Sequence, residues 1–135
     1  MHEIKHNGKT LAIIDSVRNF EVGLAFYGTA DDYVQVGRFR YDKGKVLRDH
    51  RHIARPRTVE KTQEILIVLR GSVQATTFAE EGSLAVDSRE LEEGDFFISY
   101  WGGVGFRVLT DDTRLIEIKP GPFNVNNDDE ERELL

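Results

Sequence analysis

Apolar and polar residues alternate with a period of two along most of this chain, and this alternation predicts β-strands rather than helices. The run at residues 64–70, Glu-Ile-Leu-Ile-Val-Leu-Arg, is apolar at both odd and even positions, which predicts a central strand that is covered on both faces. Before the acidic C-terminal segment, no amphipathic pattern is long enough for a helix of more than a turn or two. The strands predicted from the pattern lie at residues 10–16, 21–27, 34–41, 46–52, 64–70, 72–78, 96–99, 106–109 and 114–119.

Polar turns separate these predicted strands. Asp42-Lys43-Gly44, Glu92-Glu93-Gly94-Asp95 and Thr110-Asp111-Asp112 carry the Gly and Asp residues that tight turns require. Pro120 and Pro122 end the last strand, because proline cannot donate a ladder hydrogen bond. Many short strands with polar turns between them predict an all-β fold, either a sandwich or a small closed barrel.

Candidate chemistry is concentrated around the predicted strand at residues 46–52. His50 and His52 are two residues apart, so a strand would project both imidazoles from one face. Glu64, at the start of the next predicted strand, is a candidate third ligand. Two His and one carboxylate form a set that suits a divalent transition metal such as Fe, Mn, Ni or Zn.

The spacing of these residues resembles that of the cupin superfamily. The first cupin motif is matched by Gly44-x5-His50-x-His52, then Glu64-x6-Gly71, and the second by the segment from Gly94-Asp95 to Gly102-Gly103-Val104-Gly105. The resemblance implies a double-stranded β-barrel of the jelly-roll type and a divalent metal cofactor bound by His50, His52 and Glu64.

Two departures from the cupin pattern stand out. Eleven residues separate His52 from Glu64, where the family has only a few, so residues 53–63 are expected to form an extended loop at the barrel mouth. Val104 stands where the family has a further His, and a valine side chain cannot ligate a metal.

The candidate site residues each keep an alternative role. His50 and His52 are metal ligands, catalytic acid and base groups in a metal-free site, or hydrogen-bonded structural residues. Glu64 pairs with a metal or with an arginine, because an unpaired carboxylate within an apolar strand would be costly. Arg48 would lie on the same strand face as the His pair and is a candidate residue for binding an anionic ligand. The aromatic residues either line a ligand pocket or belong to the core: Trp101, Tyr100, Phe39, Tyr41 and Phe106.

The resemblance therefore implies a small cupin-fold protein that binds a metal and a small anionic or sugar-like ligand, with the reaction open. One alternative is a metal-free enzyme, similar to nucleotide-sugar isomerases and epimerases, in which the His pair supplies the acid and the base. Another is a ligand-binding cupin without catalysis.

Length and composition predict the number of domains and the location of the protein. A chain of 135 residues with 39% hydrophobic residues is the size of one domain, expected at residues 1–123, followed by an acidic tail at residues 124–135. The absence of cysteine excludes disulfides and thiolate metal sites, and together with the lack of an apolar leader it predicts a cytoplasmic protein.

Charge and hydropathy suggest which partners to expect. Of the net charge of −6, residues 128–133 carry −4, from five acidic residues and one arginine, and no basic stripe with interleaved aromatics appears. Nucleic acid is therefore not an expected partner. No segment has the roughly 20 apolar residues of a membrane span. Because the strand at 64–70 is apolar on both faces, the chain is expected to form a homodimer.

Overall fold

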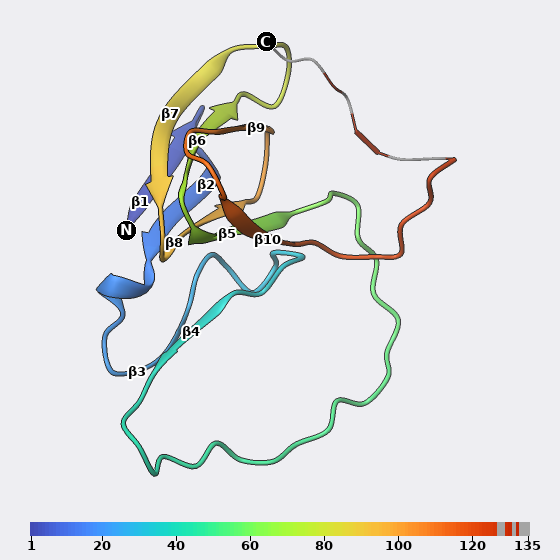
Figure 1. The fold of residues 1–135 in the computed structure, drawn as a ribbon. Coiled ribbons are helices and arrows are strands. Elements are labelled where there is room, and N and C mark those ends of the chain that lie inside the picture. The colour runs from blue at the N-terminus through green and yellow to red at the C-terminus, as the bar shows by residue number, and fades with distance from the viewer. Residues whose placement is uncertain (127–128, 131, 133–135) are drawn as a thin grey trace.

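The computed structural model describes residues 1–126, 129–130 and 132, and this part of the chain is all-β (Figure 1). A single 3-10 turn, η1 at Val17–Asn19, interrupts the strands. No helix in the described residues has the length and hydrophobicity that crossing a membrane requires. The strands are β1 His2–His6, β2 Lys9–Ser16, β3 Gly23–Phe26, β4 Gly37–Arg40, β5 Glu64–Arg70, β6 Ser72–Phe78, β7 Ala85–Glu92, β8 Asp95–Ser99, β9 Gly103–Val108 and β10 Arg114–Ile118.

These strands form three antiparallel sheets. A five-stranded sheet has the order β1-β2-β8-β5-β10, a three-stranded sheet has the order β7-β6-β9, and β3 and β4 pair as a separate ribbon. A closed barrel does not form among the described strands. The structure thus confirms the predicted all-β class at the level of paired antiparallel sheets.

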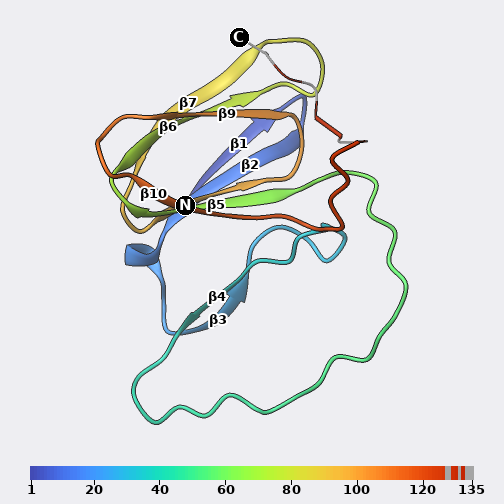
Figure 2. The same cartoon turned by 45° about the vertical axis from the view of Figure 1, so that its right-hand side comes forward.

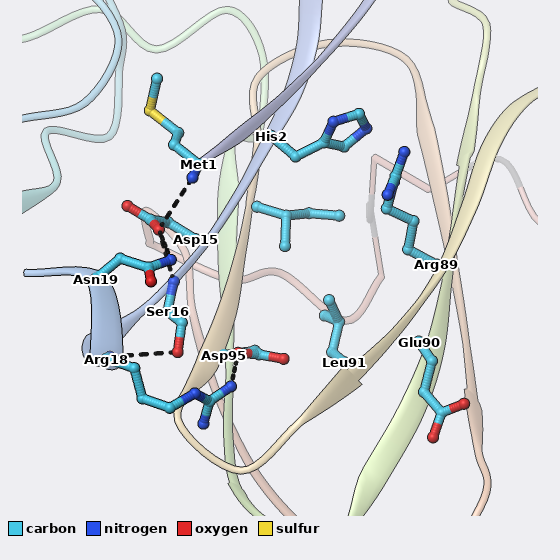
Figure 3. Close-up of a pocket in the computed structure, with 11 residues that line it drawn as sticks. Met1, His2, Asp15, Ser16, Arg18, Asn19, Arg89, Glu90, Leu91 and Asp95 are labelled. Carbon is cyan, nitrogen blue, oxygen red and sulfur yellow. Dashed lines mark hydrogen bonds and ion pairs between the residues drawn. The ribbon is translucent and has the colours of Figure 1, made fainter.

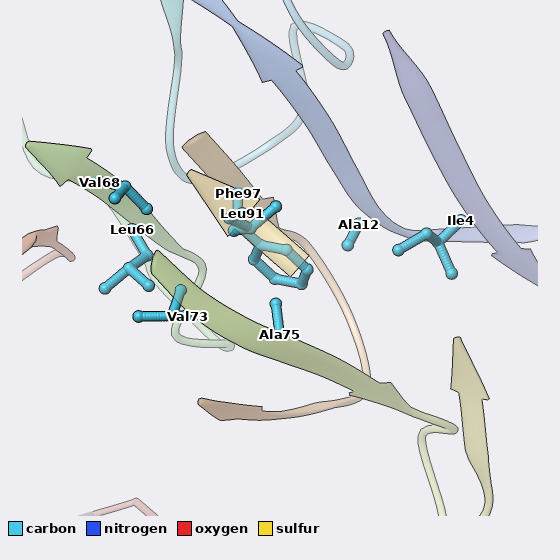
Figure 4. Close-up of a cluster of buried hydrophobic side chains, with 8 residues drawn as sticks. All are labelled: Ile4, Ala12, Leu66, Val68, Val73, Ala75, Leu91 and Phe97. Atoms are coloured by element: carbon cyan, nitrogen blue, oxygen red, sulfur yellow. The ribbon is translucent and has the colours of Figure 1, made fainter. Parts of the chain in front are cut away.

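The main core lies between the five-stranded and the three-stranded sheets. Phe97 of β8 and Leu66 of β5 contribute from the larger sheet, and Val73 and Ala75 of β6 contribute from the smaller one (Figure 4). These side chains are almost fully buried, and burying a large apolar side chain is worth about 1.5–3 kcal/mol. This packing holds the two sheets face to face.

A second core covers the opposite face of the five-stranded sheet. Ile65 and Ile98 lie on that face, and Tyr27, Val34 and Val36, from the β3–β4 region, pack against them or their neighbours. Strand β5 is apolar on both faces because each face meets a different layer of the same chain. The chain itself covers this face at Ile65, whereas Leu69 at the other end of β5 is 49% exposed, so the expected homodimer stays a prediction.

The long connection between β4 and β5 differs from the prediction of a strand at residues 46–52. Residues 42–60 are nineteen consecutive exposed residues without strand structure, and we call this segment the arm. The arm bows away from the sheets (Figure 2). Within it, Arg, Lys, Asp and His side chains occupy many of the positions that a buried strand would fill with apolar groups, and no neighbouring strand pairs with its backbone. An alternating pattern alone therefore did not produce a strand here.

Candidate functional site

A cavity of about 720 Å³ opens beside the main core, between the two large sheets. On β5 the residues that point between the sheets are Glu64, Leu66 and Val68 in turn, so the cavity begins where the polar Glu64 replaces the apolar core residues. Strand β9 supplies the facing wall. The described residues that line the cavity include Glu64, Ser99, Val104, Phe106, Glu117 and Lys119.

Two carboxyl groups meet in this cavity. Ile118 of β10 lies opposite Ile65 of β5, and Glu117 lies opposite Leu66, so the register brings Glu117 to the same sheet face as Glu64. Burial, a hydrogen bond with Glu117 and the charge of Glu117 together raise the pKa of Glu64 to about 7, against the opposing charge of Lys119. Near neutral pH Glu64 is therefore a mixture of its protonated and ionised forms, and can both donate and accept a hydrogen bond.

The lining as a whole, Glu64 and Glu117 included, has more acidic than basic residues. Among the described lining residues, six are Asp or Glu and three are Lys or Arg. Lys119 Nζ lies 3.9 Å from a carboxylate oxygen of Glu130, and the hydroxyl of Thr62 donates a hydrogen bond to Asp129. Described residues of the predicted acidic tail thus lie at this cavity, whereas residues 127–128, 131 and 133–135 are outside the described part. An acidic lining disfavours an anionic ligand.

The two histidines lie elsewhere. His50 and His52 are exposed on the arm, with ring centroids 5.0 Å apart in an edge-to-face arrangement, and neither lines the cavity. The His50 Nδ1 atom lies 3.1 Å from the carbonyl oxygen of Arg48, and Arg48 is itself exposed. Within the described residues, no group of three His, Cys, Asp or Glu side chains is placed to hold a metal. In this arrangement His50, His52 and Glu64 do not fit a divalent metal ion.

Most of the predicted aromatic residues lie outside the cavity. The Lys9 ammonium lies 3.6 Å from the ring centroid of Trp101, which packs against the second core. Phe39 of β4 is 48% exposed, and Tyr41 lies beside the Lys45 ammonium at 5.1 Å. Of the predicted aromatic residues, Phe106 does line the cavity, together with Phe78.

Two residues that the sequence motifs singled out line the cavity, and other lining residues were missed. Glu64 and Val104, from the two motifs, both line the cavity. The pairing of Glu117 and Lys119 with Glu64 was missed. A signal was present, because Leu115, Glu117 and Lys119 share one strand parity, but the partner strand of β10 was not deducible from this alternation.

A second, shallower pocket of about 360 Å³ surrounds the buried carboxylate of Asp15 (Figure 3). Asp15 accepts hydrogen bonds from Tyr27 Oη at 2.6 Å, from Asn19 Nδ2 at 2.9 Å and from the Ser16 amide at 2.9 Å. Burial alone would raise the pKa of Asp15, but these hydrogen bonds outweigh burial and lower it. Because both carboxylate oxygens are already bound within the protein, this pocket is a weaker candidate site than the larger cavity.

Comparison with known proteins found no matching protein family, curated protein or solved structure.

Proposed function

We propose that this protein binds a small, neutral, hydroxyl-rich ligand of the sugar type in the cavity between its two large sheets. The observation that carries the proposal is the Glu64–Glu117 carboxyl pair inside a cavity of about 720 Å³. Small-molecule sites occupy about 300–1,000 Å³ and combine apolar walls with a few directed polar groups.

The chemistry of the lining favours a sugar-like ligand over an anionic one. A partly protonated carboxyl pair offers both donors and acceptors to hydroxyl groups, and Ser99 adds a hydroxyl of its own. Phe106 and Val104 give an apolar wall against which the face of a sugar ring would pack. Because acidic residues outnumber basic ones in the lining, an anionic ligand would meet repulsion there.

The same proposal includes the finer fold, the double-stranded jelly-roll type of the cupins, in which two sheets face each other without closing into one continuous sheet. Two packed antiparallel sheets with a cavity between them support it, as does the presence of Glu64 and Val104 in one cavity. Residues from both sequence motifs would then share the ligand site.

The test is a panel of neutral sugars and polyols, sugar acids and small amines, screened by thermal stabilisation and then titrated by calorimetry. A neutral sugar that binds is expected to lose about tenfold in affinity with Glu64→Gln or Glu117→Gln, which corresponds to about 1.4 kcal/mol. Glu93→Gln, at an exposed position outside the cavity, is the matched control and is expected to bind normally. Binding of sugar acids alone, or binding unchanged by both cavity variants, would refute the proposal.

A second candidate function is metal-free proton transfer on such a ligand. It is favoured by the raised pKa of Glu64, about 7, because an efficient general acid or base has a pKa near the working pH. The measurement is exchange of solvent deuterium into keto sugars next to the carbonyl group. If exchange persists in the His50→Ala, His52→Ala double variant but is lost in Glu64→Gln, the proton transfer occurs in the cavity. If exchange is lost in the double variant but persists in Glu64→Gln, the His pair carries it out.

Metal binding by His50, His52 and Glu64 would require the arm to move to the cavity, and the proposed ligand binding does not depend on it. Metal binding is measured by elemental analysis after incubation with Fe, Mn, Ni or Zn. The parent protein is compared with the His50→Ala, His52→Ala double variant. Equal metal content in the two proteins would remove the His pair as a metal site.

A further inference from the structure

The arm and the rest of the chain carry opposite charge. Residues 42–60 contain six Lys or Arg and three Asp or Glu, a net charge of +3. Because the whole chain carries −6, the remaining residues together carry −9. Opposite charges on two surfaces steer their encounter and disfavour wrong partners.

The arm has strand-like character but no strand partner. Its backbone belongs to no sheet in the described structure, and its apolar side chains are open to solvent, with Val46 82% and Ile53 89% exposed. Among the described residues, the side-chain interactions of the arm are local or involve its neighbours Tyr41 and Tyr33. A loop of this length without secondary structure is uncommon in a compact domain, and such loops are usually either functional or linkers.

Strand β9 offers a matching surface. It is the outer strand of the β7-β6-β9 sheet, so one of its edges has unpaired backbone groups within the described structure. An exposed strand edge is a template for pairing with another chain. Residues 103–106 of β9 also line the acid-rich cavity, so a basic strand added at this edge would lie beside Glu64 and Glu117.

We propose that the arm of one molecule pairs with the β9 edge of a second copy of this chain, and that the two copies exchange arms in a symmetric dimer. In an added strand, Arg48, His50 and His52 would share one face, because side chains alternate along a strand. That face would be turned toward the partner's acidic cavity, and the backbone would complete the hydrogen bonds of β9. Two identical exchanges close the assembly.

A second copy fits better than the arm's own β9. The middle of the arm bows out on the side of the β3–β4 ribbon, away from β9, whereas its end at Glu60 reaches the cavity (Figures 1 and 2). The ends of the arm are also held: the Arg40 side chain donates to the Phe20 carbonyl at 2.9 Å, and buried Gln63 accepts from the Val34 amide at 3.1 Å. These anchors limit how far the arm can move within its own molecule, but they do not limit the approach of a second molecule's β9 edge.

A second copy also fits better than nucleic acid. The net charge of −9 on the residues outside the arm would repel a polyanion drawn to the arm, whereas it attracts another arm. The dimer does not depend on the proposed sugar binding. Only a role for Arg48, His50 and His52 in binding the ligand in the partner's cavity rests on the proposed function. Mass and cross-linking report on the dimer alone, and calorimetry reports on ligand binding alone.

The first experiment measures mass by sedimentation and light scattering over a range of protein concentrations. A species of twice 15.4 kDa is expected, with a dissociation constant that rises at least about tenfold between low and high salt because salt screens exposed charges. Arg48→Glu with Arg55→Glu is expected to raise this constant at least about tenfold as well. Lys5→Glu with Arg89→Glu, two equal reversals outside the arm and the cavity, is the control and is expected to dimerise more tightly than the arm variant.

The second experiment uses the absence of cysteine in the natural sequence. His50→Cys protein is mixed with Val104→Cys protein under mild oxidation, and a disulfide-linked dimer containing one of each is expected. Asp111→Cys, in the exposed turn after β9, replaces Val104→Cys as the control and is expected to cross-link poorly.

Several outcomes would overturn the proposal. They are a monomer at every concentration, a dimer that is indifferent to the arm reversals, and a His50→Cys, Val104→Cys double variant that forms its disulfide within one chain. A monomer whose arm instead binds a single-stranded oligonucleotide, with loss on Arg48→Glu and Arg55→Glu, would replace the second copy by nucleic acid.

Discussion

Protonation of Glu64 makes the stability of the folded protein depend on pH. Its carboxyl group is partly removed from water and hydrogen-bonded to Glu117, and both effects favour the protonated form. Its pKa is about 7 in the folded protein, against an ordinary value of 4.5. Between these two values the folded state binds more protons than the unfolded chain, so stability falls as pH rises through this window.

Glu64→Gln is therefore expected to be more stable than the parent protein at pH 8, by about 1–2 kcal/mol once solvent screening at the cavity mouth is allowed for. At pH 4.5 the two proteins are expected to be similar, because the parent carboxyl is then protonated. Urea unfolding at several pH values measures the difference. A difference that stays constant with pH would contradict the raised pKa.

Gly102 is a residue whose hydrogen side chain is required by close packing. A Cβ at Gly102 would lie 2.2 Å from the carbonyl oxygen of Phe78, and its φ of +77° is in the left-handed region. Gly82 has a similar φ of +71°, but a Cβ there would meet nothing within 4 Å. Comparing substitutions at Gly82 and Gly102 therefore distinguishes the cost of backbone strain from the cost of steric overlap.

Gly82→Ala is expected to cost about 1 kcal/mol from the left-handed backbone alone. Gly102→Ala is expected to cost about 3 kcal/mol or more, because the Phe78 backbone must also shift. Thermal and urea unfolding of both variants provide the comparison. Equal losses would mean that the contact with Phe78 relaxes without cost.

At the scale of elements, the β3–β4 ribbon depends on the layer beneath it. An isolated two-stranded ribbon is at best marginally stable in water. Here Tyr27, directly after β3, packs against Phe96 with ring centroids 5.6 Å apart and donates its hydroxyl to buried Asp15. The hydroxyl is therefore an anchor between ribbon and sheet.

Tyr27→Phe is expected to cost about 1–3 kcal/mol, because it leaves an oxygen of a buried carboxylate without its donor. Hydrogen exchange of the β3 and β4 amides is expected to accelerate more than exchange in β5 and β6. Tyr33→Phe, which removes only a long 3.5 Å contact with Glu60, is the control. Unchanged ribbon exchange in Tyr27→Phe would show that apolar packing alone holds the ribbon.

At the scale of the whole molecule, the arm divides the chain into two well-packed parts. Strands β1 and β2 precede the arm, yet β2 pairs with β8, which follows it. The two parts of the chain therefore share one sheet and one core. A cut within the arm would leave these contacts intact.

Brief trypsin treatment is expected to cleave first after Lys or Arg residues of the arm, about tenfold or more faster than within β5 or β10, because the arm lacks sheet hydrogen bonds. The two fragments are expected to remain associated under native conditions. Mass spectrometry of the early products identifies the sites. First cleavage at Arg70 or Arg114 would contradict the exposed arm; slower arm cleavage at higher protein concentration would accord with arm exchange.

The sequence by itself determined the all-β class and the bounds of β5 and β6, which match the predicted residues 64–70 and 72–78. These strands are dense in apolar and β-branched residues and meet at Gly71, so their signals are local. The strands β1 and β7 were missed. Both carry more charged and polar residues, so their local patterns were weaker.

Only the tertiary structure decided which strands became neighbours, and the candidate site follows from that pairing. The β5–β10 register placed Glu117 beside Glu64, and the β3–β4 region covered Ile65 on the second apolar face of β5. Residues 46–52 had an alternating pattern but gained no partner, so His50 and His52 lie on the arm. The physical reason is that a strand is held by hydrogen bonds to residues distant in the chain, so a local pattern marks a candidate strand without specifying its partner.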